Sequence, residues 1–396
     1  MPVASCAVPL PVYLPDDVMM LFLTAFSLLI WVYLCLFLGR FWHSDQILNV
    51  NPVNIQNFPD IVCVIPARDE ADSIGRTVRA LLDQDYAGNF RIVVVDDNST
   101  DGTADAARAA LKTGESKRLM IIDGEPLAKG WVGKMWAVHQ GIAAAGDAAY
   151  ILLTDADIEH ASDSLTRLAA KAEDGQLGLV SLMVKLRSIS VWEKFLIPAF
   201  VYFFQKLYPF PRVNDPESPI AAAAGGCMLV HADTLKAVGG IAEIRDQLID
   251  DCALAQLIKR RRPVWLGLAE ETKSLRAYDD LPSIWNMVAR SAYVQLKHNP
   301  LLLAGTLAGM GILYAIPPLA VLSGLLMPDP VLVSLGAAAW LVMAWTYLPT
   351  LDLYRLNTLW SLSLPFAGML YALMTLDSAR RHYTGQGGAW KGRTYS

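Results

Sequence analysis

Residues 18–38 (VMMLFLTAFSLLIWVYLCLFL) contain no charged side chain, and this run limits what the chain can fold into more than any other feature. A helix of about 20 apolar residues crosses the ~30 Å hydrocarbon core of a bilayer. The alternative, a cleaved signal peptide, has a shorter apolar region and a basic leader, whereas Asp16 and Asp17 precede this run. We therefore expect residues 1–45 to be a membrane anchor. Arg40 follows the helix, which favours an outer N-terminus and a cytosolic domain.

Apolar sequence returns late in the chain, and residues 299–378 are predicted to form further membrane helices. This part contains three apolar runs, at 301–327, 331–350 and 359–376. Prolines interrupt the first and the third run, which favours kinked, re-entrant or interfacial geometry.

The basic tail, residues 379–396, conflicts with three complete spans. If the central domain is cytosolic, three spans would place the tail outside, whereas basic residues favour the cytosolic side. The basic residues in question are Arg380, Arg381, Lys391 and Arg393. We therefore expect one of the three C-terminal segments to be only half-inserted.

Composition agrees with a membrane protein and excludes several classes of site. The chain is 54% hydrophobic and 18% charged, whereas soluble domains are nearer a quarter charged. Its net charge of −5 gives no basic field for nucleic acid. The five cysteines show no C-x-x-C spacing and the six histidines form no H-E-x-x-H cluster, so we expect reduced thiols and no zinc site.

Between these apolar parts, residues 58–298 alternate short β-branched runs with helical stretches. Strands are predicted at 61–66, 90–97, 118–123 and 150–157, and a small-residue strand at 221–230; helices are predicted at 72–82, 103–111 and 135–145. This alternation is typical of an α/β fold with a mostly parallel sheet covered on both faces. In such sheets, ligands bind beyond the carboxyl ends of the strands.

Polar residues follow these strands in order. The first strand runs into P-A-R-D-E and the second into Asp96 and Asp97, one of which suits hydrogen bonds to a base or ribose. The residue types at 99–103 are typical of a turn and of the N-cap of the helix that follows. The third strand ends in Asp155-Ala156-Asp157, where alternation puts both carboxylates on one side. Such oxygen ligands suit Mg²⁺ or Mn²⁺, although D-x-D pairs are also common in turns.

Three further features complete the candidate site. Lys134 begins a helix after a glycine-containing loop and can meet an anion there, although a solvated lysine is the alternative. Asp250 and Asp251 open another helix, where the helix dipole alone would favour an acid. Gly225 and Gly226 lie in a segment of small residues, where they leave room for a substrate. The aromatic stretch 190–210 is either core or an interfacial segment where a lipid approaches.

Taken as an ordered set over about residues 60–275, these motifs resemble the family 2 glycosyltransferases: P-A-R-D-E, V-V-D-D-N-S-T-D-G, G-K-M-W-A, T-D-A-D, A-G-G-C-M and I-D-D-C. With the anchor, the C-terminal helices and W-K-G-R at 390–393, the chain is most similar to the hopene-associated, HpnB-type branch, near the ceramide glucosyltransferases. The resemblance implies a GT-A fold, which is Rossmann-like. It also implies inverting transfer from a UDP-sugar or similar donor to a membrane lipid.

The resemblance also implies roles for individual residues. Glu70 and Asp96 or Asp97 would hold the nucleoside, Lys134 the nucleotide, and Asp155 and Asp157 the ribose and the metal. Asp251 would be the base with Asp250 beside it, and the aspartate at 250, where the family has glutamate, leaves open which of the two acts. The remaining donor-site predictions are Pro66, Ala67, Arg68, Gly226 and Arg290.

One family motif is missing, which bears on the product. Processive members carry Q-x-x-R-W, whereas this chain has W-N-M-V-A-R ending at Arg290, with Gln295 after it. We therefore expect a single transfer to a lipid on the cytosolic face of a bacterial-type inner membrane. A processive polysaccharide synthase and a non-catalytic sensor of nucleotide sugars are the alternatives.

Overall fold

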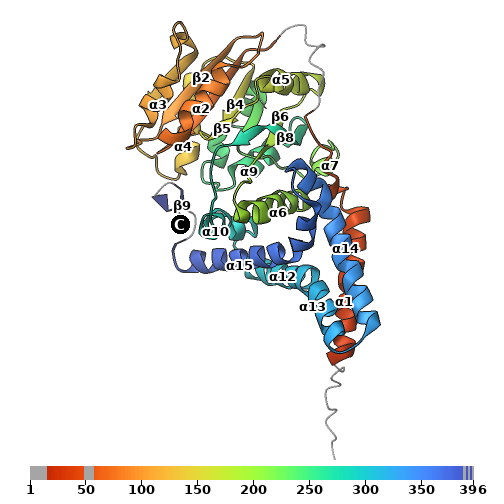
Figure 1. Cartoon of the computed structure of the whole chain (residues 1–396). Helices are drawn as coiled ribbons and strands as arrows, with labels where there is room; N and C mark the ends of the chain where they lie inside the picture. Colours follow the sequence, from red (N-terminus) through yellow and green to blue (C-terminus); the bar gives the residue numbers. More distant parts are fainter. Residues whose placement is uncertain (1–15, 49–57, 387–388, 391–392, 395–396) are drawn as a thin grey trace, which may run out of the picture.

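The structure, a computed structural model, describes residues 16–48, 58–386, 389–390 and 393–394 (Figure 1). An α/β domain lies at one end of a set of long apolar helices. Lys391 of the predicted basic tail lies outside the described residues.

The domain is built on one eight-stranded sheet with the order β3-β2-β1-β4-β7-β6-β8-β5. β7 runs antiparallel to both of its neighbours and β5 is antiparallel to β8, while the other pairs are parallel. The predicted mostly parallel α/β fold is therefore confirmed. The strands are β1 (Ile61–Ala67), β2 (Phe90–Asp96), β3 (Leu119–Asp123), β4 (Tyr150–Thr154), β5 (Ile158–Glu159), β6 (Leu179–Lys185), β7 (Cys227–His231) and β8 (Val264–Ser274). A separate two-stranded sheet pairs β9 (Ala389–Trp390) with β10 (Arg393–Thr394).

The continuous apolar runs form strands because both faces of the sheet are covered. Val62 and Val64 of β1 pack into one core with α4 and α9, while Ile61, Cys63 and Ile65 pack into a second core with α2, α3 and α5. The helices of the domain are α2 (Ala71–Leu82), α3 (Thr103–Ala109), α4 (Gly133–Ala145), α5 (Ser164–Asp174), α7 (Phe210–Val213), α8 (Ala232–Ala237) and α9 (Asp250–Lys259).

The strand predicted at 221–230 is wrong in its first half. Residues 221–226 have no regular structure, and β7 begins only at Cys227. The backbone of Ala224 pairs with a side chain instead of with a neighbouring strand. Ser181 Oγ accepts from Ala224 N (2.9 Å) and donates to Ala224 O (3.1 Å). The small residues are thereby held as a buried, irregular approach to the strand.

Within the residues that the structure describes, four helical stretches are long and apolar enough to cross a membrane. They are α1 (Asp16–Phe37), the bent stretch of α12 (Pro300–Met310), η5 (Gly311–Ala315) and α13 (Ile316–Leu326), then α14 (Pro330–Leu353), and finally η6 (Thr358–Ser363) with α15 (Leu364–Tyr383). The predicted apolar runs coincide with them. Pro317 lies in the first turn of α13 directly after the π-helical η5, whereas Pro365 begins α15 instead of interrupting a helix.

The apolar helices do not all run in the same direction (Figure 1). α1, α13 and α14 point away from the sheet, whereas α12 and α15 run across, beneath the domain. α15 packs against α12 and also against two short helices at the end of the domain, α10 (Leu281–Ala289) and α11 (Ala292–Gln295).

The aromatic stretch 190–210 forms α6 (Val191–Leu207), which joins the domain to these helices. Its start is fixed by a capping box between Ser190 and Glu193. Its buried face is core, because Tyr202 Oη lies 2.7 Å from Thr346 Oγ1 of α14 and Leu196 O accepts from Tyr371 of α15. Lys206 donates to Tyr314 Oη at 2.7 Å.

Candidate active site

The predicted site residues gather at one edge of the sheet because β1, β2 and β4 are parallel and end together. The register pairs Ala67 with Asp96, so the loops that follow these two strands lie side by side. The backbone N–H of Asp97 donates to Ala67 O over 2.8 Å. Ala67 and Asp97 therefore fix one loop against the other.

Arg68 and Asp69 lock these loops further. Arg68 Nη1 donates to Asp97 O at 2.6 Å and lies 3.8 Å from Asp97 Oδ2, with Asp97 almost fully buried. Asp69 has a positive φ of 50°, and its Oδ1 accepts from the backbone of Thr100. Arg68 thus acts here on the loop itself, a role that its place in the motif did not reveal.

Asp96 and its neighbours follow the expected turn chemistry. Asp96 Oδ1 accepts from the backbone N–H of Ser99 at 2.9 Å. Asp101 accepts from the N–H groups of both Ala71 and Thr103, and so caps the first turns of α2 and α3. The capping interpretation of residues 99–103 is confirmed, while a nucleoside-binding role for Asp96 or Asp97 stays a prediction.

Lys134 lies between carboxylates from two distant parts of the chain. Its Nζ is 3.0 Å from Asp155 Oδ1 and 3.3 Å from Asp250 Oδ2. Burial alone would lower the pKa of Lys134, but the two carboxylates more than compensate and hold its pKa above the usual value. The lysine is therefore a fixed positive charge, not the solvated side chain that was the alternative.

Asp251 is held by two backbone hydrogen bonds, and its surroundings raise its pKa. Its Oδ2 accepts from Gly225 N at 2.9 Å and its Oδ1 from Cys252 N at 2.7 Å. Burial, and then the neighbouring Asp250, raise the pKa of Asp251 to about 6. A carboxylate with a pKa just below neutrality is ionised at pH 7 and can still accept a proton, which suits a general base.

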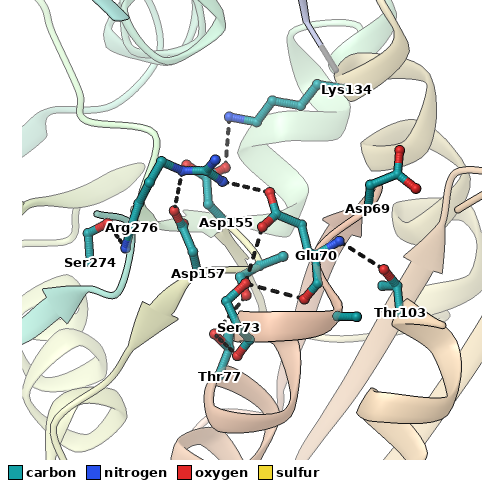
Figure 2. A network of polar contacts seen from close by, with 12 residues as sticks. Asp69, Glu70, Ser73, Thr77, Thr103, Lys134, Asp155, Asp157, Ser274 and Arg276 are labelled. Atoms are coloured by element: carbon teal, nitrogen blue, oxygen red, sulfur yellow. Dashed lines mark hydrogen bonds and ion pairs between the residues drawn. The ribbon is translucent and has the colours of Figure 1, made fainter. Parts of the chain in front are cut away.

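The second acid of the D-x-D pair meets a residue that sequence reasoning missed (Figure 2). Arg276 Nε donates to Asp157 Oδ2 at 2.7 Å, and its Nη2 donates to Glu70 Oε1 at 2.6 Å. Glu70 also accepts from Ser73 Oγ, and its backbone N–H donates to Thr103 Oγ1. A lone arginine two positions after a long strand carries no motif, so only the β5–β8 pairing that brings it to Asp157 could have indicated it.

A small cavity lies at the centre of this arrangement, lined by Pro66, Lys134, Thr154, Asp155, Gly225 and Asp250 among others. Gly225 lines it, whereas Gly226 packs against Val184 and its carbonyl accepts from Thr154 Oγ1. A Cβ at Gly225 would lie 3.4 Å from Lys134 Nζ and 3.6 Å from Asp251 Oδ2. Of the two glycines expected to leave room for a substrate, Gly225 is thus the one beside the charged groups.

Arg290 lies at the rim of the site. It is exposed directly after α10. Burial raises the pKa of Tyr278, while the positive charges of Arg276 and Arg290 oppose this increase, which places Arg290 near the same segment. Tyr208, at the end of α6, accepts from Gln295 Nε2 at 2.6 Å, and Asp251 is among the charges that raise the pKa of Tyr208 after burial.

In the described part of the chain, no group of three or more His, Cys, Asp or Glu side chains is placed to hold a metal. Asp155 and Asp157 are nevertheless close, since the charge of Asp155 is the largest contribution after burial to the raised pKa of Asp157. Two carboxylates suit a cation that takes its other ligands from water and phosphate.

Parts of the chain are similar in sequence to a protein family and to known proteins. Residues 62–239 match the family model described as glycosyl transferase family 2. An N-acetylglucosaminyltransferase of Rhizobium leguminosarum bv. viciae is 32% identical over 133 residues, which cover 33% of this chain and 28% of that protein. One from Bradyrhizobium elkanii is 27% identical over 154 residues, covering 36% of this chain and 81% of that protein.

The comparison with solved structures concerns the fold. A mannosyltransferase from Pyrobaculum calidifontis, solved with GDP-Man and Mn²⁺, superimposes with a TM-score of 0.57 at 18% identity, over 93% of this chain and 98% of that one. The predicted GT-A fold is confirmed. This chain spans little more than a quarter of the length of the Rhizobium relative.

Proposed function

We propose, from the premise that the chain carries a family 2 glycosyltransferase domain, that it moves one sugar from a nucleotide-sugar donor to a lipid hydroxyl, with inversion. The observation that carries the proposal is the placement of Asp251. It is held by two backbone N–H groups, has a pKa of about 6, and adjoins the Lys134–Asp155–Asp250 cluster.

The donor is proposed to bind at the ends of β1, β2 and β4. Glu70 and Asp96 or Asp97 would hold the nucleoside, since they lie on the adjacent loops after β1 and β2. Lys134 would meet the diphosphate from the first turn of α4, where backbone N–H groups also favour an anion. Arg290 at the rim is proposed as a second contact for the diphosphate.

Asp155 and Asp157 are proposed to hold a divalent cation, Mg²⁺ or Mn²⁺. Their proximity and burial fit a cation that neutralises neighbouring carboxylates. When bound, such an ion stabilises the negative charge that develops on the leaving diphosphate. The relative from Pyrobaculum was solved with Mn²⁺, which supports the proposal by analogy.

The transfer itself would use Asp251. Its carboxylate would take the proton of the acceptor hydroxyl as that oxygen forms a bond to the anomeric carbon, and the bond from that carbon to the nucleoside diphosphate breaks on the opposite face. One in-line displacement inverts the anomeric centre. Asp250 would keep Lys134 in place, since it already lies 3.3 Å from Nζ.

The acceptor is proposed to be a membrane lipid, with a hopanoid or sphingolipid-like molecule suggested by the sequence resemblance. α6 supports this proposal because it is core to the apolar helices and ends at Tyr208, close to Asp251. Ile189 and Val191 at its other end are 65% and 70% exposed, as expected for side chains that meet lipid.

We further propose a domain on the cytosolic face with three spans: α1, the bent stretch from α12 through η5 to α13, and α14. α15 runs across beneath the domain (Figure 1) and exposes Phe366, Leu373 and Leu376, so it would lie in the bilayer surface. The C-terminal tail then stays on the side of the domain, and α15 is the half-inserted segment that the sequence could not identify.

The test is a donor screen with the purified full chain in nanodiscs that contain membrane lipid extract. UDP-GlcNAc, UDP-Glc and GDP-Man are offered with Mn²⁺ or with EDTA, and products are identified by mass spectrometry. We expect a lipid carrying one added sugar, formed only with metal, and none from Asp251→Asn. A ladder of additions would show a processive synthase, and binding without turnover would show a sensor; either result refutes the proposal.

A further inference from the structure

Arg276 is a charged residue of the site, and the proposed transfer reaction gives it no role. Its two hydrogen bonds, 2.7 Å to Asp157 and 2.6 Å to Glu70, join the ends of β4 and β1 to the segment after β8 (Figure 2). The side chains of Asp157 and Glu70 are only 8% and 13% exposed, whereas that of Arg276 is 38% exposed. The guanidinium therefore covers the two acids on their solvent side.

The acids need a counter-ion whether or not a substrate is present. Asp155, Asp157 and Glu70 lie around Arg276 (Figure 2), whose guanidinium is 2.7 Å from Asp157 and 2.6 Å from Glu70, so their negative charges repel one another at short range. Lys134 already pairs with Asp155 and Asp250. Arg276 thus partly compensates the negative charge of the other two acids, Asp157 and Glu70.

The backbone around Arg276 is fixed, although its side chain is half exposed. Leu275 N donates to Asp157 O at 2.7 Å and Arg276 N donates to Ser274 Oγ at 3.3 Å. Two residues on, Tyr278 N donates to the buried Glu193 at 2.9 Å. A change at Arg276 can therefore be a rotation of the side chain alone, with no movement of the strand.

We propose that Arg276 and a divalent cation compete for Asp157. The inference rests on the proposed function in taking Asp157 as a metal ligand. A divalent ion on Asp157 repels the guanidinium and withdraws the carboxylate charge that holds it there. Metal binding therefore breaks the bond from Nε to Asp157, while Glu70 keeps its bond to Nη2. Arg276 reduces the net negative charge of the empty site and so weakens its affinity for metal until the diphosphate brings its own oxygens.

The experiment is a titration of the full chain in nanodiscs with Mn²⁺ alone, followed by the electron paramagnetic resonance signal of the free ion. We expect Arg276→Gln to bind Mn²⁺ about tenfold more tightly than the unchanged chain. Arg276→Lys, which keeps the charge, should stay near the unchanged chain. The matched control is Arg76→Gln, which removes an arginine whose 2.8 Å ion pair to Glu159 lies outside the cluster.

Equal or weaker Mn²⁺ binding in Arg276→Gln overturns the proposal, as does Mn²⁺ binding that survives Asp157→Asn. Thermal unfolding of each variant shows whether it folds, and Arg276→Lys supplies the comparison if Arg276→Gln does not. No donor or acceptor is present in the titration. A failure to transfer sugar would therefore refute the proposed function and leave the competition standing. Equal Mn²⁺ binding in Arg276→Gln would refute the competition and leave the proposed function standing.

Discussion

The backbone N–H of Gly225 lies 2.9 Å from Oδ2 of Asp251, so the irregular segment before β7 orients the first turn of α9. The same glycine lines the cavity with Lys134 and Asp250. The backbone that leads into a strand and the first turn of a helix, 26 positions apart, thus meet at one carboxylate.

Asp251→Asn should abolish transfer while the donor still binds. The amide keeps the shape of the side chain but cannot take a proton, so we expect the rate to fall about 10²- to 10⁴-fold. The measurement is turnover beside calorimetric binding of the donor. Asp246→Asn, an exposed acid in the preceding loop, is the matched control and should keep full activity.

The pH profile should report Asp251. Because its pKa is about 6, the base is protonated and inactive below that pH, and kcat/KM should fall about tenfold per unit on the acidic side and level off above it. Rates at fixed Mn²⁺ from pH 4.5 to 8 test this. A profile that is flat across pH 6 would exclude Asp251 as the base.

Asp251 should also lower stability at neutral pH. Its pKa rises from an ordinary 3.8 to about 6 on folding, so the folded protein holds more protons between these values and the free energy of unfolding falls as pH rises through this window. Asp251→Asn removes that pH dependence, so the stability of the variant relative to the unchanged chain should be higher at pH 7.5 than at pH 4, by up to about 2 kcal/mol. Thermal unfolding of both proteins at the two pH values checks it, because the difference between pH values cancels the loss of the hydrogen bond that the amide NH2 cannot accept from Gly225 or Cys252.

Lys134→Met should destabilise the protein, because it leaves Asp155 and Asp250 without their shared cation. Removing one member of a largely buried ion pair costs about 3 kcal/mol. Adding Asp250→Asn should recover part of this loss, since one uncompensated charge then disappears. Unfolding followed by tryptophan fluorescence in detergent measures both variants, and independent, additive effects would refute the coupling.

The membrane arrangement predicts a labelling pattern in sealed vesicles. Single cysteines replacing the exposed residues Lys117 in the domain and Gln386 after α15 should react with an impermeant maleimide from the same side. A cysteine at Pro328, between α13 and α14, should react from the opposite side. The unchanged chain sets the background. Labelling of Gln386 together with Pro328 would mean that α15 crosses the bilayer.

Sequence reasoning found the acids because each follows an apolar run and because parallel strands end at one edge. It placed Lys134 correctly for the same reason, since Gly133 and Lys134 begin a helix beside the strand ends. It missed Arg276, which lies 119 positions from Asp157 and follows the half-exposed end of β8. That contact depends on tertiary pairing, which local pattern does not encode.

The orientation of the apolar helices could likewise not be predicted from local sequence. The apolar runs were located by hydropathy, but hydropathy cannot tell whether a helix crosses the bilayer or lies along it. That distinction depends on partners such as the bond from Tyr371 to Leu196 O, which holds α15 against α6. The first half of the strand predicted at 221–230 was wrong because Ser181 pairs with the backbone of Ala224 in place of a neighbouring strand.

The bond between Tyr202 and Thr346 joins residues 144 positions apart and buries the middle of α6 against α14. α6 is therefore translated before α14 and α15, two of the helices on which it packs. Until these two helices arrive, the part of the aromatic face of α6 that they bury has no partner within the chain. Packing of the domain against these apolar helices thus waits for segments that follow the whole eight-stranded sheet in the sequence.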